Sequence, residues 1–376
     1  MRVAAIYSIV SGAYPMVSPG PSRRPFLAIA AIVLIVLSFA SAFAWTGGWL
    51  VPARLSGAVL IDSLQSNTGK VFPGFRRAHT KGICVAGHFD SNGAGSALST
   101  AALFRTGSVP VTGRFNTGGS VPTGADSDQI FRGLGMRFVL ADGEEWRMAL
   151  DQTPIFVVSN PADFVALQVA STPDRATGQP DPGRMKAFLS THPETQRFFD
   201  YLEKTPMPSG FANGTYYSIN AFRFIDAHGV ARFVRWQFEP EQPFAALDKR
   251  TAGTLPANFL FDDLLERIHH GPVKWHLVLV QANPADRTDN ATIAWSGPHR
   301  RIDAGTLVFD AIATEADGHC RDFNYDPLIL PKGIASSDDP LLPARSAAYS
   351  VSFNRRAAEG PRPDAITLEH DHGAAK

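Results

Sequence analysis

The sequence predicts an α+β fold in which eight antiparallel strands close into a barrel and helices pack outside it. Two observations support this prediction: about eight strand-like segments, mostly in neighbouring pairs, and helical segments between and after them. The 376 residues, 44% of them hydrophobic, are enough to bury a large core, and 26 phenylalanines indicate a phenylalanine-rich interior. A barrel of eight strands is just wide enough to be filled by side chains or to hold one small ligand.

The strand signals are apolar or alternating segments separated by turn residues. Gly143 and Gly229 mark two predicted hairpin turns, which favour antiparallel pairing of the segments on either side. The predicted strands span residues 83–89, 109–115, 136–140, 145–150, 216–225, 230–238, 275–281 and 306–313.

Four helices are predicted outside the strands. They span residues 162–169, 193–203 and 256–270 and a last segment that starts at residue 339. Thr254 is the predicted N-cap of the third helix. Asp339 is the predicted N-cap of the last helix, with Pro340 at its first helical position.

An uncharged apolar run at residues 26–45 is long enough to cross a bilayer. Arg23 and Arg24 precede it, so the positive-inside rule places the N-terminus in the cytoplasm and the later residues on the extracytoplasmic or periplasmic side. We expect an uncleaved membrane anchor; a cleaved signal peptide and a twin-arginine export signal at residues 22–27 are the alternatives. The predicted organisation is a cytoplasmic segment (1–25), the anchor or signal (26–45), a linker (46–64), a folded domain (65–358) and a polar disordered tail (359–376).

Charge and cysteine content exclude several classes of protein. The 35 basic and 35 acidic residues balance, which disfavours an electrostatic nucleic-acid binder. Cys84 and Cys320 are too few for a disulfide scaffold or a site of clustered cysteine ligands. They are expected either to pair in an oxidising compartment or to remain free and buried.

Two residue pairs have a spacing that suggests chemistry. His79 follows Arg76 and Arg77, whose charges oppose protonation, and a neutral imidazole can act as a general base. Tyr349 comes four residues after Arg345 on the predicted last helix, so the two side chains share a face. A guanidinium there favours the phenolate, which is a known axial ligand of ferric haem. From spacing alone, the favoured interpretation is a surface histidine in a basic turn for the first pair and a cation–π or packing contact for the second.

Together with the surrounding motifs, these residues resemble the haem catalase family. The motifs are, in order, Arg76-X-X-His79-X-Lys81-Gly82, Arg114-Phe115, Trp146 followed by Thr153-Pro154-Ile155-Phe156, Asp326-Pro327, Gly333-Ile334-X-X-Ser337-Asp338-Asp339 and Arg345-X-X-X-Tyr349. The likeness covers roughly residues 65–356. The chain looks most like the minimal catalase-related peroxidases, which consist of little more than the haem barrel.

The resemblance implies haem b as the cofactor and a role for each matching residue. His79 would move a proton between the peroxide oxygens, giving a ferryl haem, and Gln152, where the family has asparagine, would hydrogen-bond the peroxide. Tyr349 would bind the iron through its phenolic oxygen, and Arg345 would stabilise the phenolate form of Tyr349. The remaining haem-binding positions are Arg76, Arg114 and Arg356, beside the propionates, and Phe115 and Phe164, beside the ring.

Departures from the family pattern shape the expected activity. Gln152 replaces an asparagine, Asn116 replaces a serine that orients the histidine, and Ala78 replaces a bulkier residue. We expect a haem peroxidase that reduces hydrogen peroxide or organic hydroperoxides with a small electron donor, with weak or no catalase activity. The alternatives are a hydroperoxide isomerase on the same barrel and a non-enzymatic haem-binding protein. The sequence predicts no particular oligomeric state.

Overall fold

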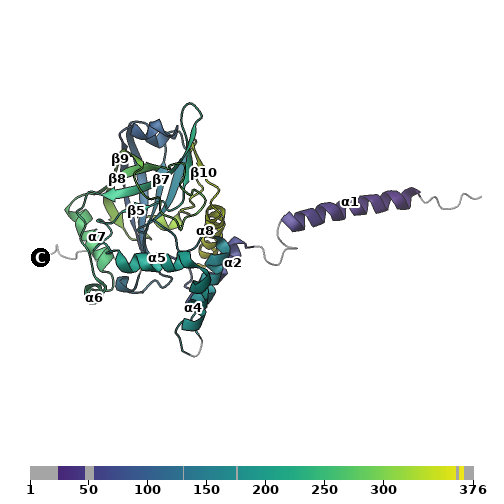
Figure 1. Ribbon diagram of the computed structural model, residues 1–376, viewed down its shortest axis with the longest axis horizontal. Helices are drawn as coiled ribbons and strands as arrows, with labels where there is room; N and C mark the ends of the chain where they lie inside the picture. The colour runs from purple at the N-terminus through teal and green to yellow at the C-terminus, as the bar shows by residue number, and fades with distance from the viewer. Residues whose placement is uncertain (1–23, 47–54, 130, 175–176, 361–363, 368–376) are drawn as a thin grey trace, which may run out of the picture. The chain divides into compact units, whose positions relative to one another are not determined.

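The computed structural model describes residues 24–46, 55–129, 131–174, 177–360 and 364–367 (Figure 1). The chain divides into two units, with the boundary between Arg54 and Leu55. In the first unit, α1 (Arg24–Thr46) confirms the predicted apolar helix, whose length and composition suit a membrane anchor or a signal sequence. Residues 22 and 23 of the predicted twin-arginine motif lie outside the described residues.

The second unit is built on a closed antiparallel barrel of eight strands, as predicted. The ring runs β1-β2-β3-β4-β5-β7-β8-β9 and closes through pairing of β9 with β1. Its strands are β1 (Gly82–Ser91), β2 (Gly107–Thr117), β3 (Arg132–Val139), β4 (Glu145–Asp151), β5 (Tyr216–Tyr217), β7 (Ala231–Pro240), β8 (Val273–Gln281) and β9 (Arg300–Ala313). Two short strands, β6 (Phe222–Ile225) and β10 (Ile334–Ser336), extend the sheet beyond β7.

The predicted strand at residues 216–225 is two strands, β5 and β6. Ile219 lies between them with a φ of 62°, in the left-handed region that a β-branched residue adopts only under constraint. This backbone reversal ends β5 and lets β6 leave the ring.

Buried side chains from the described strands pack together in the barrel interior. Along β4, Trp146, Met148 and Leu150 point inward and are buried, while the residues between them face outward. The Trp146 ring packs edge-on against Trp236, with ring centroids 5.1 Å apart. A barrel of eight strands can either be filled by side chains or hold one small ligand, and these contacts favour the filled barrel.

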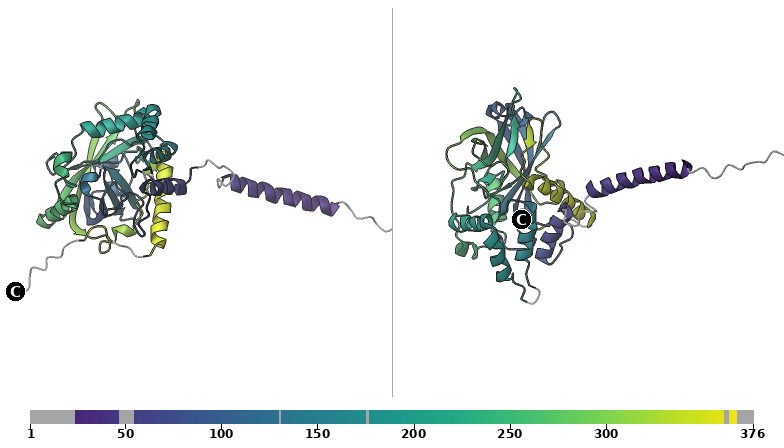
Figure 2. Two further views of the ribbon diagram at one scale, coloured as in Figure 1. Left: turned by 90° about the horizontal axis from the view of Figure 1, so that it is seen from below. Right: turned by 45° about the vertical axis from the view of Figure 1, so that its right-hand side comes forward.

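The helices pack outside the barrel and are gathered toward its lower end in Figure 1 (Figures 1 and 2). They are α2 (Gly57–Thr68), α3 (Pro161–Ser171), α4 (Pro182–Thr191), α5 (Pro193–Lys204), α6 (Lys249–Ala252), α7 (Phe259–His270) and α8 (Leu341–Ala358). Helix α2 packs against both α8 and α3. Residues 57–64 of the predicted linker therefore belong to the compact unit.

Two predicted helix starts are shifted. Helix α7 begins at Phe259, and its N-cap residue is Asn258 rather than Thr254, whose hydroxyl donates to the carbonyl of Thr251. Helix α8 begins at Leu341, and Asp339 Oδ1 accepts from the Leu341 amide at 2.9 Å. The Asp339 carboxylate thus accepts from the first helical amide, but the N-cap residue is Pro340 and not Asp339 as predicted.

Contacts far apart in sequence fix the ends of the domain. A disulfide joins Cys84 on β1 to Cys320, which settles the pairing that the sequence left open. The predicted disordered tail is wrong for residues 364–367, where Asp364 accepts from Arg321 at 2.6 Å and Ile366 is buried. These two contacts hold that segment on the barrel.

Candidate functional site

A cavity of about 520 Å³ lies outside the barrel wall, between the outward faces of β2, β3 and β4 and the helices α2, α3, α5 and α8. Six of the nine side chains predicted for the site line it: Arg76, His79, Arg114, Phe164, Arg345 and Tyr349. The segments that carry them are far apart in sequence, and the barrel and α8 bring them together.

His79 is held by Asn116. The His79 Nδ1 and Asn116 Oδ1 atoms are 2.7 Å apart, and Asn116 Nδ2 donates to the Arg114 carbonyl at 3.2 Å. Because Asn116 therefore presents its oxygen to the ring, Nδ1 carries the proton and Nε2 keeps a free lone pair. The His79 backbone has a φ of 55°, a constrained conformation that is concentrated at functional sites.

The His79 imidazole is neutral over most of the pH range. Burial beside the cavity, followed by the charge of Arg114, lowers its pKa to about 4. The prediction of a neutral histidine is confirmed, but burial contributes more than the arginines do. Arg77, one of the two expected neighbours, is turned away and pairs with Glu359.

Arg114 is already paired with a carboxylate from this chain. Its Nε and Nη2 atoms donate to the two oxygens of buried Glu315 at 2.7 and 3.0 Å, and Nη1 donates to the His79 carbonyl at 2.9 Å. The close approach requires a glycine at position 82, where a Cβ atom would lie 2.4 Å from the guanidinium. Arg114 thus fixes the His79 backbone, a role that the sequence did not suggest.

Arg76 and Arg356 converge on one loop. Arg76 Nη2 donates to the Phe323 carbonyl at 3.0 Å, and Arg356 Nη2 donates to the Arg321 carbonyl at 2.6 Å. Arg356 borders a smaller cavity of about 100 Å³ instead of the main one. Burial lowers the pKa of Arg76 to about 10, and its buried Nε has no hydrogen-bond partner within the described part of the chain. An anionic ligand group would therefore stabilise Arg76.

Tyr349 and Arg345 share the cavity-facing side of α8, as the i, i+4 spacing predicts. Arg345 Nη1 donates to Asn220 Oδ1 at 2.5 Å, and Nη2 donates to the Ala149 carbonyl at 3.2 Å. Asn220 Nδ2 in turn donates to Asp339 at 2.8 Å. This network fixes α8, and with it Tyr349, against the barrel wall.

Two predicted residues do not reach the cavity because of strand alternation. Gln152 points toward the barrel, where its Nε2 donates to the Tyr216 hydroxyl at 3.4 Å, and the preceding Asp151 lines the cavity instead. Phe115 is fully buried in the barrel interior, with its ring 5.2 Å from Phe211 and 5.7 Å from Trp275. The interpretation of Phe115 as a residue beside the cofactor is therefore corrected.

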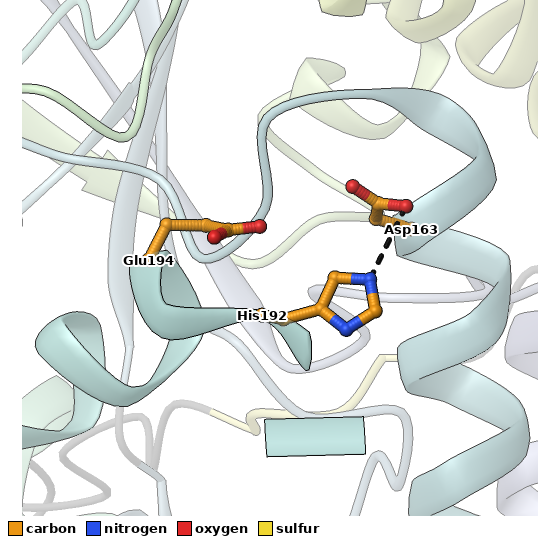
Figure 3. A group of neighbouring side chains, drawn as sticks. All are labelled: Asp163, His192 and Glu194. Atoms are coloured by element: carbon orange, nitrogen blue, oxygen red, sulfur yellow. Dashed lines mark ion pairs between the residues drawn. The ribbon is translucent and has the colours of Figure 1, made fainter. Parts of the chain in front are cut away.

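A second cluster of polar side chains lies at the N-terminal ends of α3 and α5. The ligand-type atoms of Asp163, His192 and Glu194 all lie within 4.8 Å of one another (Figure 3). Two contacts of this cluster belong to helix ends. Asn160 caps α3 by accepting a hydrogen bond from the Asp163 amide, and His192 Nδ1 lies 2.8 Å from the Phe188 carbonyl at the end of α4. We assign no site to this cluster.

The sequence profile of the catalase family matches residues 45–366. The chain belongs to the catalase family. Catalase-related peroxidases of Synechococcus elongatus and Mycolicibacterium paratuberculosis are 36% and 31% identical to it, over 88% and 79% of this chain and 95% and 93% of theirs. The family resemblance predicted from the motifs is confirmed.

Solved catalases confirm the fold. A fungal catalase and catalase A of Saccharomyces cerevisiae superpose with TM-scores of 0.69 and 0.68, at 20% and 19% identity over 79% of this chain. The chain spans 62% and 64% of those two catalases, so it covers less than two thirds of their length.

The catalase family implies a haem iron, and the cavity residues fit that group. Tyr349 offers a phenolic oxygen, a known iron ligand in this cofactor class. Arg76 offers a buried guanidinium nitrogen without a partner within the described residues. The cavity volume lies within the usual range for small-molecule and cofactor sites.

Proposed function

We propose that this catalase-family chain reduces hydrogen peroxide or an organic hydroperoxide with electrons from a small donor. Its relatives of matching length are catalase-related peroxidases, which supports the enzyme class, a haem peroxidase. The observation that favours this function most is the buried, neutral imidazole of His79, which faces the same cavity as Tyr349.

Residues on three sides of the cavity would hold haem b. Tyr349 would bind the iron, Arg76 would pair with a propionate, and Phe164 would lie beside the ring, where it already stacks on Phe156. Bound haem would supply the electron transfer that breaks the O–O bond. Arg114 would act through His79 rather than directly, because Glu315 already neutralises its charge.

His79 would move the proton. Its free Nε2 would accept a proton from the O–H of the peroxide and deliver it to the second oxygen, which would leave as water from hydrogen peroxide or as ROH from an organic hydroperoxide. The first oxygen would end as water once the donor has supplied two electrons and two protons have been taken up. Asn116 keeps the Nδ1 proton in place, so the ring returns to the same tautomer after each cycle. Overall, ROOH, two electrons from the donor and two protons give ROH and water.

We further propose that this chain has weak or no catalase activity. A hydroperoxide isomerase would give a rearranged product without consuming donor, and a haem carrier would leave peroxide unchanged. Product analysis after a single addition of peroxide separates these three activities.

We also propose that α1 anchors the chain in a membrane with the barrel on the extracytoplasmic side. The apolar length of α1 and the disulfide between Cys84 and Cys320 support this location, because disulfides persist mainly in oxidising compartments. Extraction of cell membranes with alkaline carbonate tests the anchor: release of the chain into the supernatant would contradict it.

Absorption spectra of the full-length chain in detergent test the proposed function. We expect a ferric haem spectrum that Tyr349→Phe alters, together with oxidation of an added donor when peroxide is supplied. Tyr201→Phe is the matched control, because Tyr201 on α5 does not line the cavity and should leave the spectrum unchanged. Absence of haem from wild-type protein that is expressed with ample haem would contradict the proposal.

A further inference from the structure

Helices α2 and α3 form part of the wall of the cavity. Their inner faces contribute mostly apolar side chains to it, among them Leu60, Leu64 and Leu167. The two helices pack against each other, and Asn67 on α2 donates to Gln168 on α3 at 2.8 Å. Because a helix with its side chains is about 10 Å thick, the outer surface of this pair lies close to the candidate site.

The outer surface of the two helices is largely apolar. Val59 is exposed on α2, and the exposed positions of α3 are alanines and Val169, whose exposed fraction is 56%. The exposed apolar residues on and beside these helices, which we call the α2–α3 surface, are Leu55, Val59, Val71, Ala162, Ala166 and Val169. Exposed apolar residues that gather on adjacent elements indicate a contact with a protein or a membrane.

Few charges interrupt the α2–α3 surface. Each helix carries one charged residue, Asp62 on α2 and Asp163 on α3. Asp62 accepts from Arg355 on α8 at 2.6 Å, and Asp163 lies 3.4 Å from His192 before α5. Both carboxylates therefore have partners within the folded unit, and the surface offers apolar contact rather than a negative charge.

Two basic residues flank the α2–α3 surface. Lys70 is exposed and directly precedes Val71. Arg184, which is partly exposed, donates to the carbonyl of Val169 at 3.2 Å. Apolar side chains beside lysine and arginine are typical of surfaces in the headgroup region of a membrane, where the cations meet lipid phosphates.

The chain itself ties the α2–α3 surface to the proposed membrane anchor. Helix α1 ends at Thr46 and α2 begins at Gly57, so the connection spans at most about 40 Å even when it is fully extended. Trp45 and Trp49 stand at the end of the apolar run, and tryptophan is enriched at membrane–water interfaces. Helix α2 is thus the first helix that the chain forms after the anchor.

We propose that the α2–α3 surface rests on the phospholipid headgroups of the membrane that α1 crosses. This inference rests on the proposed anchor and is independent of the proposed peroxidase activity. Val59 and Val169 enter the headgroup region, and Lys70 and Arg184 lie beside the phosphates. The contact holds the cavity one helix layer away from the lipid.

The test uses the full-length chain in vesicles of phosphatidylcholine and phosphatidylglycerol. The sequence has two cysteines and both lie in the disulfide, so an introduced cysteine is the only free thiol. A nitroxide label on Val59→Cys or Val169→Cys collides with oxygen, which concentrates in lipid, or with a nickel chelate, which stays in water. We expect oxygen to relax both labels more strongly than nickel.

Val230→Cys is the matched control, because Val230 is an exposed valine between β6 and β7. Nickel should relax its label more strongly than oxygen. Labels at positions 59 and 169 that behave like this control would overturn the inference and leave the anchor intact. Labels that neither reagent reaches would also overturn it, because a protein partner would then cover the surface.

Charged substitutions give a second readout. A label on Val71→Cys should be accessible to oxygen, and Val59→Asp combined with Val169→Asp should make it accessible to nickel instead. Val230→Asp should leave that label unchanged. A label that the double substitution does not shift would overturn the inference. Release of the wild-type chain from the vesicles by alkaline carbonate would instead remove the anchor, and this inference with it.

Discussion

At the residue scale, the chemistry of this site depends on which atom of each side chain is already occupied. The hydrogen bond to Asn116 uses Nδ1 of His79, so Nε2 is free to accept a proton. Arg114 forms an ion pair with Glu315 and also donates a hydrogen bond to the His79 carbonyl. A histidine beside several arginines could serve many purposes, but these contacts restrict His79 to accepting a proton through one nitrogen.

Removal of the Asn116 side chain should impair catalysis without removing the cofactor. In Asn116→Ala the ring can rotate and exchange tautomers, so we expect kcat to fall roughly tenfold, the equivalent of about 1.4 kcal/mol for one lost hydrogen bond. Steady-state kinetics measure kcat, and the absorption spectrum measures haem content. Asn116→Ser, which keeps an oxygen acceptor, should recover part of the rate; equal loss in both variants would contradict this role.

The protonation of His79 should set the acid limit of activity. Because burial lowers its pKa to about 4, the imidazole is a competent base above that pH and is lost as a base below it. The acid limb of kcat/KM should therefore fall near pH 4 rather than near 6.5. An acid limb close to the pKa of free histidine would show that His79 is more exposed than the structure indicates.

At the element scale, buried polar contacts join segments that are distant in sequence. Arg114 and Glu315 connect β2 to the segment after β9, and Arg345 with Asn220 connects α8 to the segment between β5 and β6. Each contact holds one side of the cavity. The helices themselves follow from local signals such as the Asn160 cap of α3.

Disruption of the ion pair between Arg114 and Glu315 should destabilise the fold. Glu315→Gln leaves a guanidinium uncompensated in the interior, so we expect the free energy of unfolding to fall by about 3 kcal/mol at neutral pH. Chemical denaturation measures the change. Glu239→Gln, in an exposed pair with Arg301, is the matched control and should cost less than about 1 kcal/mol.

The ion pair between Arg114 and Glu315 should also make the free energy of unfolding depend on pH. Burial opposes ionisation of Glu315, but the charge of Arg114 and its hydrogen bonds outweigh it and lower the pKa below the usual range. The stabilisation is therefore present above the carboxyl pKa of the unfolded chain and is lost as pH falls through the lower folded value. The difference in stability between wild type and Glu315→Gln should shrink below about pH 4.5, and a constant difference would contradict this.

At the scale of the whole molecule, one covalent link spans most of the domain. The disulfide between Cys84 and Cys320 closes a separation of 236 residues and holds the loop whose carbonyl groups accept from Arg76 and Arg356. Cross-links that close long loops reduce the conformational freedom of the unfolded chain.

Loss of the disulfide should lower stability and weaken the cofactor site together. We expect Cys84→Ser combined with Cys320→Ser to reduce the free energy of unfolding by about 2–4 kcal/mol, as judged by denaturation of the full-length chain. Wild-type protein treated with reductant is the matched comparison and should behave like the double variant. Unchanged stability in both would show that packing alone holds the loop.

Much of the candidate site could be predicted from the resemblance of several separated motifs to the catalase family, whereas the spacing within each motif did not decide it. His79 and Tyr349 were both placed at one site, and the structure brings them to one cavity. The prediction that Gln152 faces the cavity could have been corrected from the sequence. The apolar residues Trp146, Met148 and Leu150 alternate along the strand, and Gln152 continues this inward-facing series whereas Asp151 does not. No local signal pointed to Glu315, because its partner lies 201 residues away.

The sequence by itself determined the local features of this protein: alternating strands, helix ends, an apolar segment at residues 26–45 and the spacing of His79 and Tyr349 within their motifs. Those features depend on residues close together in the chain. The tertiary structure alone decided that the barrel interior is packed, that the cavity lies outside the wall, and that Asp151, rather than Gln152 or Phe115, borders it. These outcomes depend on strand register and on contacts across the fold. A shift of one residue in the register of a strand would exchange its inward-facing and outward-facing side chains.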